Sequence, residues 1–296
     1  MKKLLALLFA AALTMTAQAQ FIGWIEVGDY YNPTQVYNGS FFDMAPTNFY
    51  LAHTGAQMIY TPDLLAAING KEGVRIQYLN FKFHNETFEL ITRNVRVYLQ
   101  ETDATEFAVN EDGVKQFFDL GTLVAQGRYE FDMLDSYGDD QALVIEMQEP
   151  LAITAGKGLL VTIVFDAEDD DNCTMGSDYA PFYTSGIRGK AMTYTDNWTS
   201  FVDYTMGDHF PDATSMLGCG TNVELPVTEI GYTYERLRGD VNGDGYVNIT
   251  DATTLINHLL GSVPDAFYEV NANVNDDAEV NISDAIMLIN MLSGSM

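Results

Sequence analysis

Apolar and polar residues follow two different patterns in this chain, and each dominates a different part of it. Between residues 20 and 225, short runs rich in Val, Ile, Tyr, Phe and Thr either alternate with polar residues or stand unbroken. Both arrangements are typical of β-strands, because successive side chains of a strand point to opposite faces of a sheet. The sequence therefore predicts a mainly β region that is long enough to bury one sizeable core.

The strands of this region can be placed from their runs. The clearest are predicted at 74–83, 94–99, 143–147 and 159–165, with a bulge near Leu79, and weaker ones at 120–125, 179–184, 190–194, 201–205 and 215–225. One short helix is predicted at 62–68, where Pro62 stands early and Gly70 follows. Many strands and few helices favour a β-sandwich of jelly-roll type, with a barrel as the alternative.

A helical period appears only near the C-terminus, and it appears twice. One apolar face is formed by Ala252, Leu255, Ile256 and Leu259, and the same face returns 33 residues later at Ala285, Leu288, Ile289 and Leu292. This i, i+3, i+4, i+7 spacing predicts two amphipathic helices. Asn248 and Asn281 are placed to cap their N-termini, and Gly261 and Gly294 to end them.

A polar loop precedes each predicted helix, and its oxygen-bearing residues have the spacing of a calcium loop. Positions 1, 3, 5, 7, 9 and 12 of such a loop supply the ligands, with a backbone carbonyl at position 7 and a turn at position 6, where Gly245 stands. We therefore predict two calcium ions. The ligands of the first loop are Asp240, Asn242, Asp244, Tyr246, Asn248 and Asp251, and those of the second are Asn273, Asn275, Asp277, Glu279, Asn281 and Asp284.

The two loops are not equivalent in charge. The first offers three carboxylates and the second only two, because Asn273 occupies position 1 and Ala278 replaces the glycine of position 6. Fewer negative ligands weaken calcium binding, so the second site is predicted to be the looser one. Without metal, the converging carboxylates repel, and we expect calcium binding to drive the folding of this segment.

Two calcium loop–helix units in tandem resemble a type I dockerin, over roughly residues 238–296. The resemblance implies a small all-α, calcium-binding module of two loop–helix (F-hand) repeats that docks to a cohesin domain on a scaffold or cell surface. It places the cohesin contacts at Ile249, Thr250, Ile256 and Asn257, and in the second repeat at Ile282, Ser283, Ile289 and Asn290. Ile256-Asn257 and Ile289-Asn290 replace the basic pair of many members, and core packing is the alternative for both isoleucines.

The beginning of the chain predicts secretion. Lys2 and Lys3 precede an apolar run that ends in Ala17-Gln18-Ala19, which is the pattern of a secretory signal peptide at 1–19. The run is too short to span a bilayer as a helix, so no membrane insertion is expected. We therefore expect an extracellular protein, attached to the cell surface through cohesin, with a β domain at 20–225, a connector or last strand at 226–237 and the dockerin at 238–296.

Net charge and the remaining reactive residues limit the partners and the kinds of site that can be expected. A net charge of −28 makes nucleic acid an unsuitable partner. In an oxidising compartment Cys173 and Cys219 are predicted to form a disulfide, with two free thiols as the alternative. The acidic run 168–172 is expected to be a hydrated loop, and the four scattered histidines carry no metal motif.

No motif identifies the function of the β domain, so two hypotheses stand. The first is a non-catalytic domain for adhesion or carbohydrate binding, for which Trp24, Trp198 and the many tyrosines offer stacking surfaces, although core packing is the usual role of such aromatics. The second is a polysaccharide-degrading enzyme of a cellulosome-like complex, a hydrolase acting on O-glycosyl bonds. Its two carboxylates cannot be chosen among 42 acidic residues.

Overall fold

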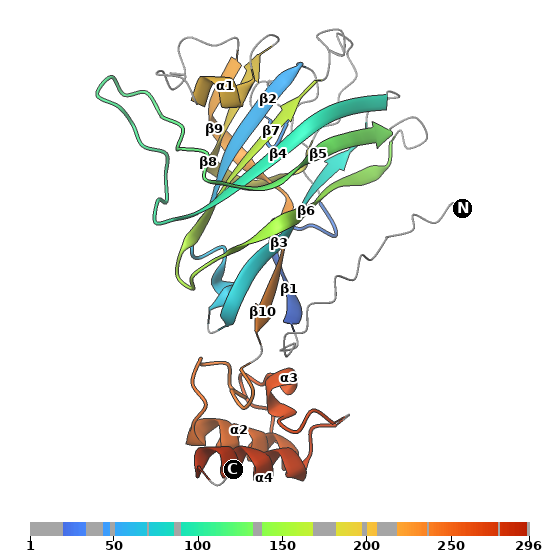
Figure 1. The fold of residues 1–296 in the computed structure, drawn as a ribbon, viewed down its shortest axis with the longest axis vertical. Coiled ribbons are helices and arrows are strands. Elements are labelled where there is room, and N and C mark those ends of the chain that lie inside the picture. The colour runs from blue at the N-terminus through green and yellow to red at the C-terminus, as the bar shows by residue number, and fades with distance from the viewer. Residues whose placement is uncertain are drawn as a thin grey trace. The chain divides into compact units, whose positions relative to one another are not determined.

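The computed structural model describes residues 20–33, 44–47, 51–69, 71–85, 90–132, 138–167, 182–196, 200–205, 218–235, 237–277 and 279–294. The chain divides into two compact units, a large β unit and a small helical one near the C-terminus (Figure 1). The predicted signal peptide, Cys173, Trp198 and the acidic run 168–172 lie outside the described residues. Among those that are described, no helix is both long enough and apolar enough to cross a bilayer.

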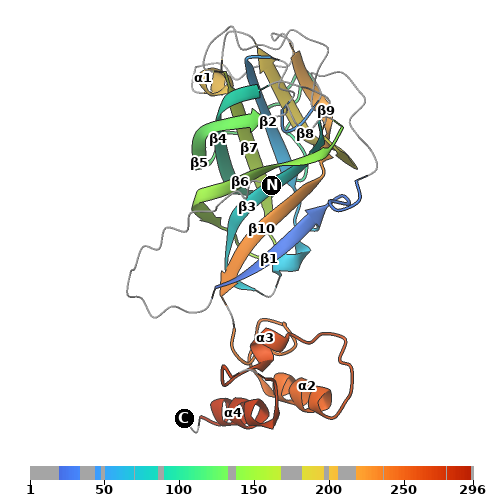
Figure 2. The same ribbon diagram turned by 90° about the vertical axis from the view of Figure 1, so that its right-hand side faces the viewer.

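The β unit contains two sheets, as the strand pattern predicted (Figures 1 and 2). The four-stranded sheet has the order β1-β10-β3-β6 and the six-stranded sheet the order β5-β4-β7-β2-β8-β9. The strands are β1 (Gln20–Val27), β2 (His53–Tyr60), β3 (Glu72–His84), β4 (Leu90–Thr102), β5 (Thr122–Asp132), β6 (Asp140–Ala152), β7 (Gly158–Asp166), β8 (Thr184–Asp196), β9 (Gly218–Pro226) and β10 (Thr228–Glu235).

One hydrophobic core joins the inner faces of the two sheets. It includes Ile25 and Ile145 from the four-stranded sheet and Met58, Val97 and Ile163 from the six-stranded sheet. Removal of this apolar surface from water is the main force that holds such a sandwich together. Strand β6 buries every second residue around Ile145, because one face of the strand lies against this core and the other is exposed. This arrangement explains the alternation in its sequence.

A second cluster covers the other face of the six-stranded sheet. It joins Ile59, Leu160 and Val164 of the central strands to Phe117 and Phe201, which lie outside the sheet. Strand β7 is consequently buried at every residue, and it pairs antiparallel with β2 on one side and β4 on the other. This burial on both faces explains why β7 reads as an unbroken apolar run rather than an alternating one.

Two sequence predictions need correction in this unit, and one that was left open takes its strand alternative. Residues 201–205 form a short helix, α1 (Phe201–Thr205), rather than a strand, because Phe201 and Val202 pack into the second cluster from above the sheet. The predicted helix 62–68 is a turn followed by a 3-10 helix at Ala66–Ile68. Residues 226–237 are largely strand β10, which lies between β1 and β3, so the β unit extends past the predicted border at 225.

The helical unit contains α2 (Ile249–Leu259), α3 (Glu269–Ala272) and α4 (Ile282–Leu292) (Figure 1). Leu255 of α2 and Leu288 of α4 are fully buried in a small core, which also takes up Val241 and Val274 from position 2 of the two loops. The single-turn helix α3 just before the second loop was not predicted. Its four residues show no helical period, and Ala272 alone is buried.

Candidate functional site

The first loop brings three carboxylates together. The carboxylate oxygens of Asp240, Asp244 and Asp251 lie within 4.8 Å of one another, with Asp240 and Asp251 buried and Asp244 exposed. Like charges this close repel, unless a cation or hydrogen-bond donors compensate them. Three oxygen anions that converge from one short loop are the donor set that a hard cation such as calcium prefers, so the residues of this loop fit the ion.

Asp251, the last residue of the loop, also holds the loop against helix α2. Its Oδ1 accepts a hydrogen bond from the backbone N–H of Asn242 (3.0 Å) and its Oδ2 one from that of Asn248 (2.8 Å). Asn248 in turn caps α2, because its Oδ1 accepts from the N–H of Thr250 at 2.8 Å. The two side chains form a reciprocal capping box, which satisfies backbone donors that a helix start otherwise leaves without partners.

The second loop repeats these bonds almost atom for atom. Asp284 accepts from the N–H of Asn275 (3.0 Å) and of Asn281 (2.9 Å), and Asn281 caps α4 by accepting from Ser283 at 2.8 Å. Asp277 accepts from the N–H of Glu279 at 2.9 Å, as Asp244 does from the N–H of Tyr246. The duplication that was read from the sequence is therefore also a duplication of geometry.

The loops differ in the groups that would face an ion. In the second loop Asn275 donates from Nδ2 to Asp277 (2.8 Å), and Asn273 donates from Nδ2 to the carbonyl of Asp277 (2.6 Å). The three-carboxylate cluster is found in the first loop, and the described part of the chain holds no second cluster of that kind. The predicted order of affinity, with the second site weaker, stays a prediction.

A left-handed residue at loop position 4 is a requirement that sequence analysis missed. Gly243 has φ +71° and Asp276, its counterpart, has φ +61°. Glycine adopts this conformation without strain, whereas an aspartate does so at some cost. Asp276 also forms an ion pair with Arg238. Gly245 at position 6 has φ +84°, as its role in the turn predicts, and Ala278 lies outside the described residues.

The two repeats are joined by hydrogen bonds to backbone carbonyls near the starts of the loops. The N–H of Gly239 donates to the carbonyl of Asn271 (3.0 Å), and Asn271 Nδ2 donates to the carbonyl of Asp240 (2.8 Å). The N–H of Tyr268 donates to the carbonyl of Val241 at 2.9 Å. The position of the first calcium loop therefore depends on residues next to the second.

The helix residues that the dockerin resemblance implicates lie mostly at the surface. Ile249 is 70% exposed and Ile282 63% exposed, and Thr250, Ser283, Asn257 and Asn290 are exposed as well. The remaining pair is not symmetric, because Ile256 is half-buried against the small core whereas Ile289 is 44% exposed. Core packing, the alternative considered for both isoleucines, therefore fits Ile256 better than Ile289.

In the β unit, one of the two aromatic residues singled out from the sequence lies at the surface. Trp24 of β1 is 45% exposed and stacks on Tyr78 of β3, with ring centroids 5.8 Å apart. Between them lies Gly231 of β10, where an added Cβ would come within 2.6 Å of the indole. The absent side chain at Gly231 allows both rings to approach the outer face of the four-stranded sheet.

The other reactive residues of this unit show structural contacts. His53 Nδ1 lies 2.8 Å from Asp166 Oδ1, and His84 Nδ1 lies 3.1 Å from Asp140 Oδ1. In the helical unit, His258 stacks on Phe267 with centroids 3.7 Å apart. The backbone of Cys219 belongs to β9, but Cys173 lies outside the described residues, so the disulfide stays a prediction.

Comparison with known proteins identifies one part of the chain. Residues 238–293 match the family model of the dockerin type I domain, and they cover both loops together with α2, α3 and α4. A comparison with curated proteins gave no match for the chain. The C-terminal segment is thus a type I dockerin domain, as its duplicated loops indicated, and the residues that the family model matches do not include the β unit.

Proposed function

We propose that the type I dockerin domain at 238–293 attaches this protein, outside the cell, to a cohesin domain of a scaffold or surface protein, and that it does so only when calcium is bound. The family match and the three converging carboxylates of the first loop support this assignment. A cellulosome-like complex is the setting that such a domain implies. The predicted signal peptide accounts for delivery to that setting.

Two calcium ions are proposed, one in each loop, with the first bound more tightly. Asp240 and Asp251 are fully buried, so without a cation two negative charges stay close together inside a small module. Calcium would remove this repulsion and leave the loops in the form that presents both helices. The residues proposed to hold each ion are the twelve given above.

The docking surface is proposed to be the exposed side of α2 and α4 near their N-termini. Helix α4 shows a continuous apolar stripe formed by Ile282, Ile286 and Ile289, which are 63%, 55% and 44% exposed. Helix α2 presents Ile249, but Thr253 stands where α4 has Ile286. Because exposed apolar patches of this kind mark protein contacts, the near-symmetry of the repeats would let either helix dock, with α4 the more apolar.

Charge placed on this surface tests the docking proposal. Thr250→Asp and Ser283→Asp lie at equivalent positions of the two helices. Each single variant should still bind cohesin, through the helix that is not changed. The double variant should abolish binding to every type I cohesin that the wild type binds, measured by calorimetry with and without chelator. Ser262→Asp, which is exposed beyond α2, is the matched control. Full binding by the double variant would refute this surface.

For the β unit we propose a non-catalytic role, in adhesion or carbohydrate binding. The observation that favours it is the exposed Trp24, stacked beside Tyr78 on the outer face of the four-stranded sheet. Aromatic rings that present an apolar face together with a polar tip are suited to the faces of sugar rings. Trp24→Ala should weaken binding of neutral β-glucans without changing thermal stability, because Trp24 is not part of the core.

A polysaccharide hydrolase is the second candidate for this unit, since dockerins commonly carry enzymes that cleave O-glycosyl bonds. The two roles differ in one measurement. Incubation of the full chain with the polysaccharides that it binds should release no reducing ends if the domain is non-catalytic. Release that a catalytic-carboxylate substitution eliminates would establish the enzyme instead.

A further inference from the structure

The first calcium loop contains an asparagine followed directly by a glycine, Asn242-Gly243, at its positions 3 and 4. In such a pair the backbone nitrogen of the glycine can attack the side-chain carbonyl carbon of the asparagine, because the glycine has no Cβ to obstruct the approach. Gly243 has φ +71°, a conformation that glycine adopts without strain. The loop that is proposed to bind calcium is thus also open to a spontaneous chemical change of one of its ligands.

The backbone N–H of Gly243 is not tied into the hydrogen bonds of the loop. Among the residues that the structure describes, it has no acceptor. The N–H of Asn242, one residue earlier, donates by contrast to Asp251 Oδ1 at 3.0 Å. Gly243 is also half-buried rather than buried, so water reaches it. The nitrogen that would attack therefore has no hydrogen bond to break and can lose its proton to solvent.

The side chain of Asn242 makes a contact that depends on its amide group. Its Nδ2 donates to Thr250 Oγ1 at 3.4 Å, and this hydroxyl gives its own hydrogen to Asn248 Oδ1 at 2.6 Å. A hydroxyl has a single hydrogen, so toward Asn242 the oxygen of Thr250 can only accept. An aspartate at position 242 would lose this bond and place a second acceptor against the same oxygen. Because Thr250 belongs to the proposed docking surface, Asn242 connects the loop to that surface.

We propose that Asn242 deamidates when the first loop has lost its calcium, and that this change ends calcium binding by that loop. The nitrogen of Gly243 forms a bond to Cγ of Asn242, and Nδ2 leaves as ammonia together with the proton of the attacking N–H. A cyclic succinimide remains. Water then opens the ring at either carbonyl group, which gives aspartate or isoaspartate. One water is consumed and one ammonia is released, and no oxidant or reductant is needed.

Calcium binding and the modification use the same side chain. The amide of Asn242 must rotate toward the nitrogen of Gly243 before the ring can close, and it is not able to do so while its Oδ1 serves as the ligand of loop position 3. Isoaspartate adds a methylene group to the backbone between Asp240 and Asp244, whose carboxylates converge with that of Asp251 within 4.8 Å. The proposal rests on the calcium role proposed for this loop, and it adds an irreversible step that follows loss of the ion.

The test follows the mass change of deamidation in the full-length chain by peptide mass spectrometry, during incubation with calcium in excess or with chelator. Asn242 should convert at least about tenfold faster in chelator than with calcium. Two other asparagines of the same sample are controls. Asn69 is exposed, outside both loops, and followed by Gly70, so it should convert at the same rate in both conditions. Asn275 is followed by Asp276 and should convert slowly in both.

Gly243→Asp is the matched variant, because it gives the first loop the residue that the second loop has at this position, where Asp276 has φ +61°. The fresh variant should still bind calcium. In chelator it should convert Asn242 at least about tenfold more slowly than the wild type, since a side chain now obstructs the attack. When wild type is incubated in chelator and returned to calcium, calorimetry should show fewer bound ions, in proportion to the isoaspartate formed.

Equal conversion of Asn242 in calcium and in chelator would overturn the proposal, as would full calcium binding by chains that carry isoaspartate at position 242. The calcium role itself has a separate test, in calorimetry of the fresh protein. Absence of calcium binding there would reject the proposed function. Normal binding, together with an Asn242 that stays intact in chelator, would reject the modification alone.

Discussion

Replacement of Asp251 by alanine should unfold the dockerin domain even when calcium is present in excess. Both carboxylate oxygens of this fully buried residue accept backbone N–H groups, from Asn242 at 3.0 Å and from Asn248 at 2.8 Å. The variant removes both acceptors at once and leaves two donors near the start of α2 without a partner. Asp251 therefore has a structural role that does not depend on the ion.

The size of the effect follows from these two bonds. A hydrogen bond to a charged group contributes about 1.5–3 kcal/mol, so the pair contributes about 3–6 kcal/mol. A unit of about 60 residues has a free energy of unfolding of about 3–9 kcal/mol at about 0.05–0.15 kcal/mol per residue. The loss thus approaches the whole stability of the module, and bound calcium would not restore it.

Asp244 offers the contrast, because it is exposed and accepts a hydrogen bond from the N–H of Tyr246 at the surface of the loop. Asp244→Ala removes no buried acceptor, so the domain should still fold when calcium is in large excess. It should instead lose calcium stabilisation, by about 2.7 kcal/mol when affinity falls about 100-fold under saturating conditions. Replacement of Asp251 is therefore predicted to reduce the stability of the folded loop, and replacement of Asp244 to weaken calcium binding.

Amide hydrogen exchange of the full chain, followed by mass spectrometry, separates the two outcomes. Peptides from 237–294 should lose protection in Asp251→Ala even with calcium in excess, whereas in Asp244→Ala they should lose it only when calcium is limiting. Asp265→Asn removes an exposed charge outside both loops and is the control. If Asp251→Ala exchanged like Asp265→Asn with calcium in excess, the structural role of Asp251 would be wrong.

Three further predictions concern affinity, packing and pH. In a calcium titration followed by NMR, amide signals of loop 240–251 should shift before those of loop 273–284, because the second loop has fewer carboxylates. Gly239→Ala should destabilise the dockerin by about 2–4 kcal/mol in calorimetry, since its φ is +94° and an added Cβ would lie 2.7 Å from Leu288. Burial alone would raise the pKa of Asp166, but hydrogen bonds from His53, Arg96 and Ser200 outweigh it and lower that pKa. The stability from this lowered pKa is present above the ordinary value of about 4 and lost as pH falls through the lower folded value. The difference in Tm between wild type and Asp166→Asn should therefore be widest near neutral pH and narrow below about pH 4.

Sequence analysis succeeded where function and local structure use the same residues. In the dockerin loops, Asp251 and Asn248 are ligand candidates and also cap the helix that follows, so one short spacing predicts the loop, the helix start and the ion together. The strands around Ile145 and Ile163 were equally clear. Burial of one face gives alternating apolar and polar residues, and burial of both faces gives a continuous apolar run.

Prediction was wrong where distant contacts override local preference. Residues 201–205 carry a strand-like composition, but Phe201 and Val202 pack onto a sheet formed by β2, β7 and β8, and that contact selects a helix. Strand β10 was left open between strand and connector, since its partners β1 and β3 lie some 150 to 200 residues earlier in the chain. The residues next to a strand in the sequence do not show which distant strands it will pair with.

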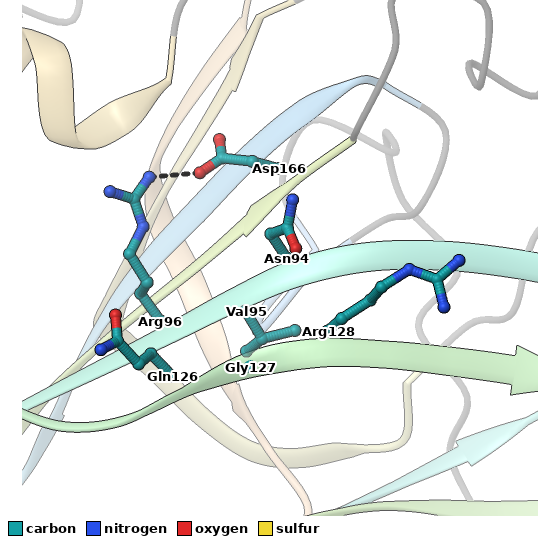
Figure 3. Close-up of a pocket in the computed structure, with 7 residues that line it drawn as sticks. All are labelled: Asn94, Val95, Arg96, Gln126, Gly127, Arg128 and Asp166. Carbon is teal, nitrogen blue, oxygen red and sulfur yellow. Dashed lines mark hydrogen bonds and ion pairs between the residues drawn. The ribbon is translucent and has the colours of Figure 1, made fainter.

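The sequence by itself determined the dockerin, its two loops of proposed calcium ligands and the helices that follow them, because within each repeat every proposed ligand and helix N-cap lies in one loop of twelve residues. Only the tertiary structure decided which polar residues of the β unit meet. Arg96 and Asp166 come from strands far apart in the chain, and the antiparallel pairing of β4 with β7 brings their side chains together at one site (Figure 3). Sheet register, which no local spacing encodes, places the side chains of that site.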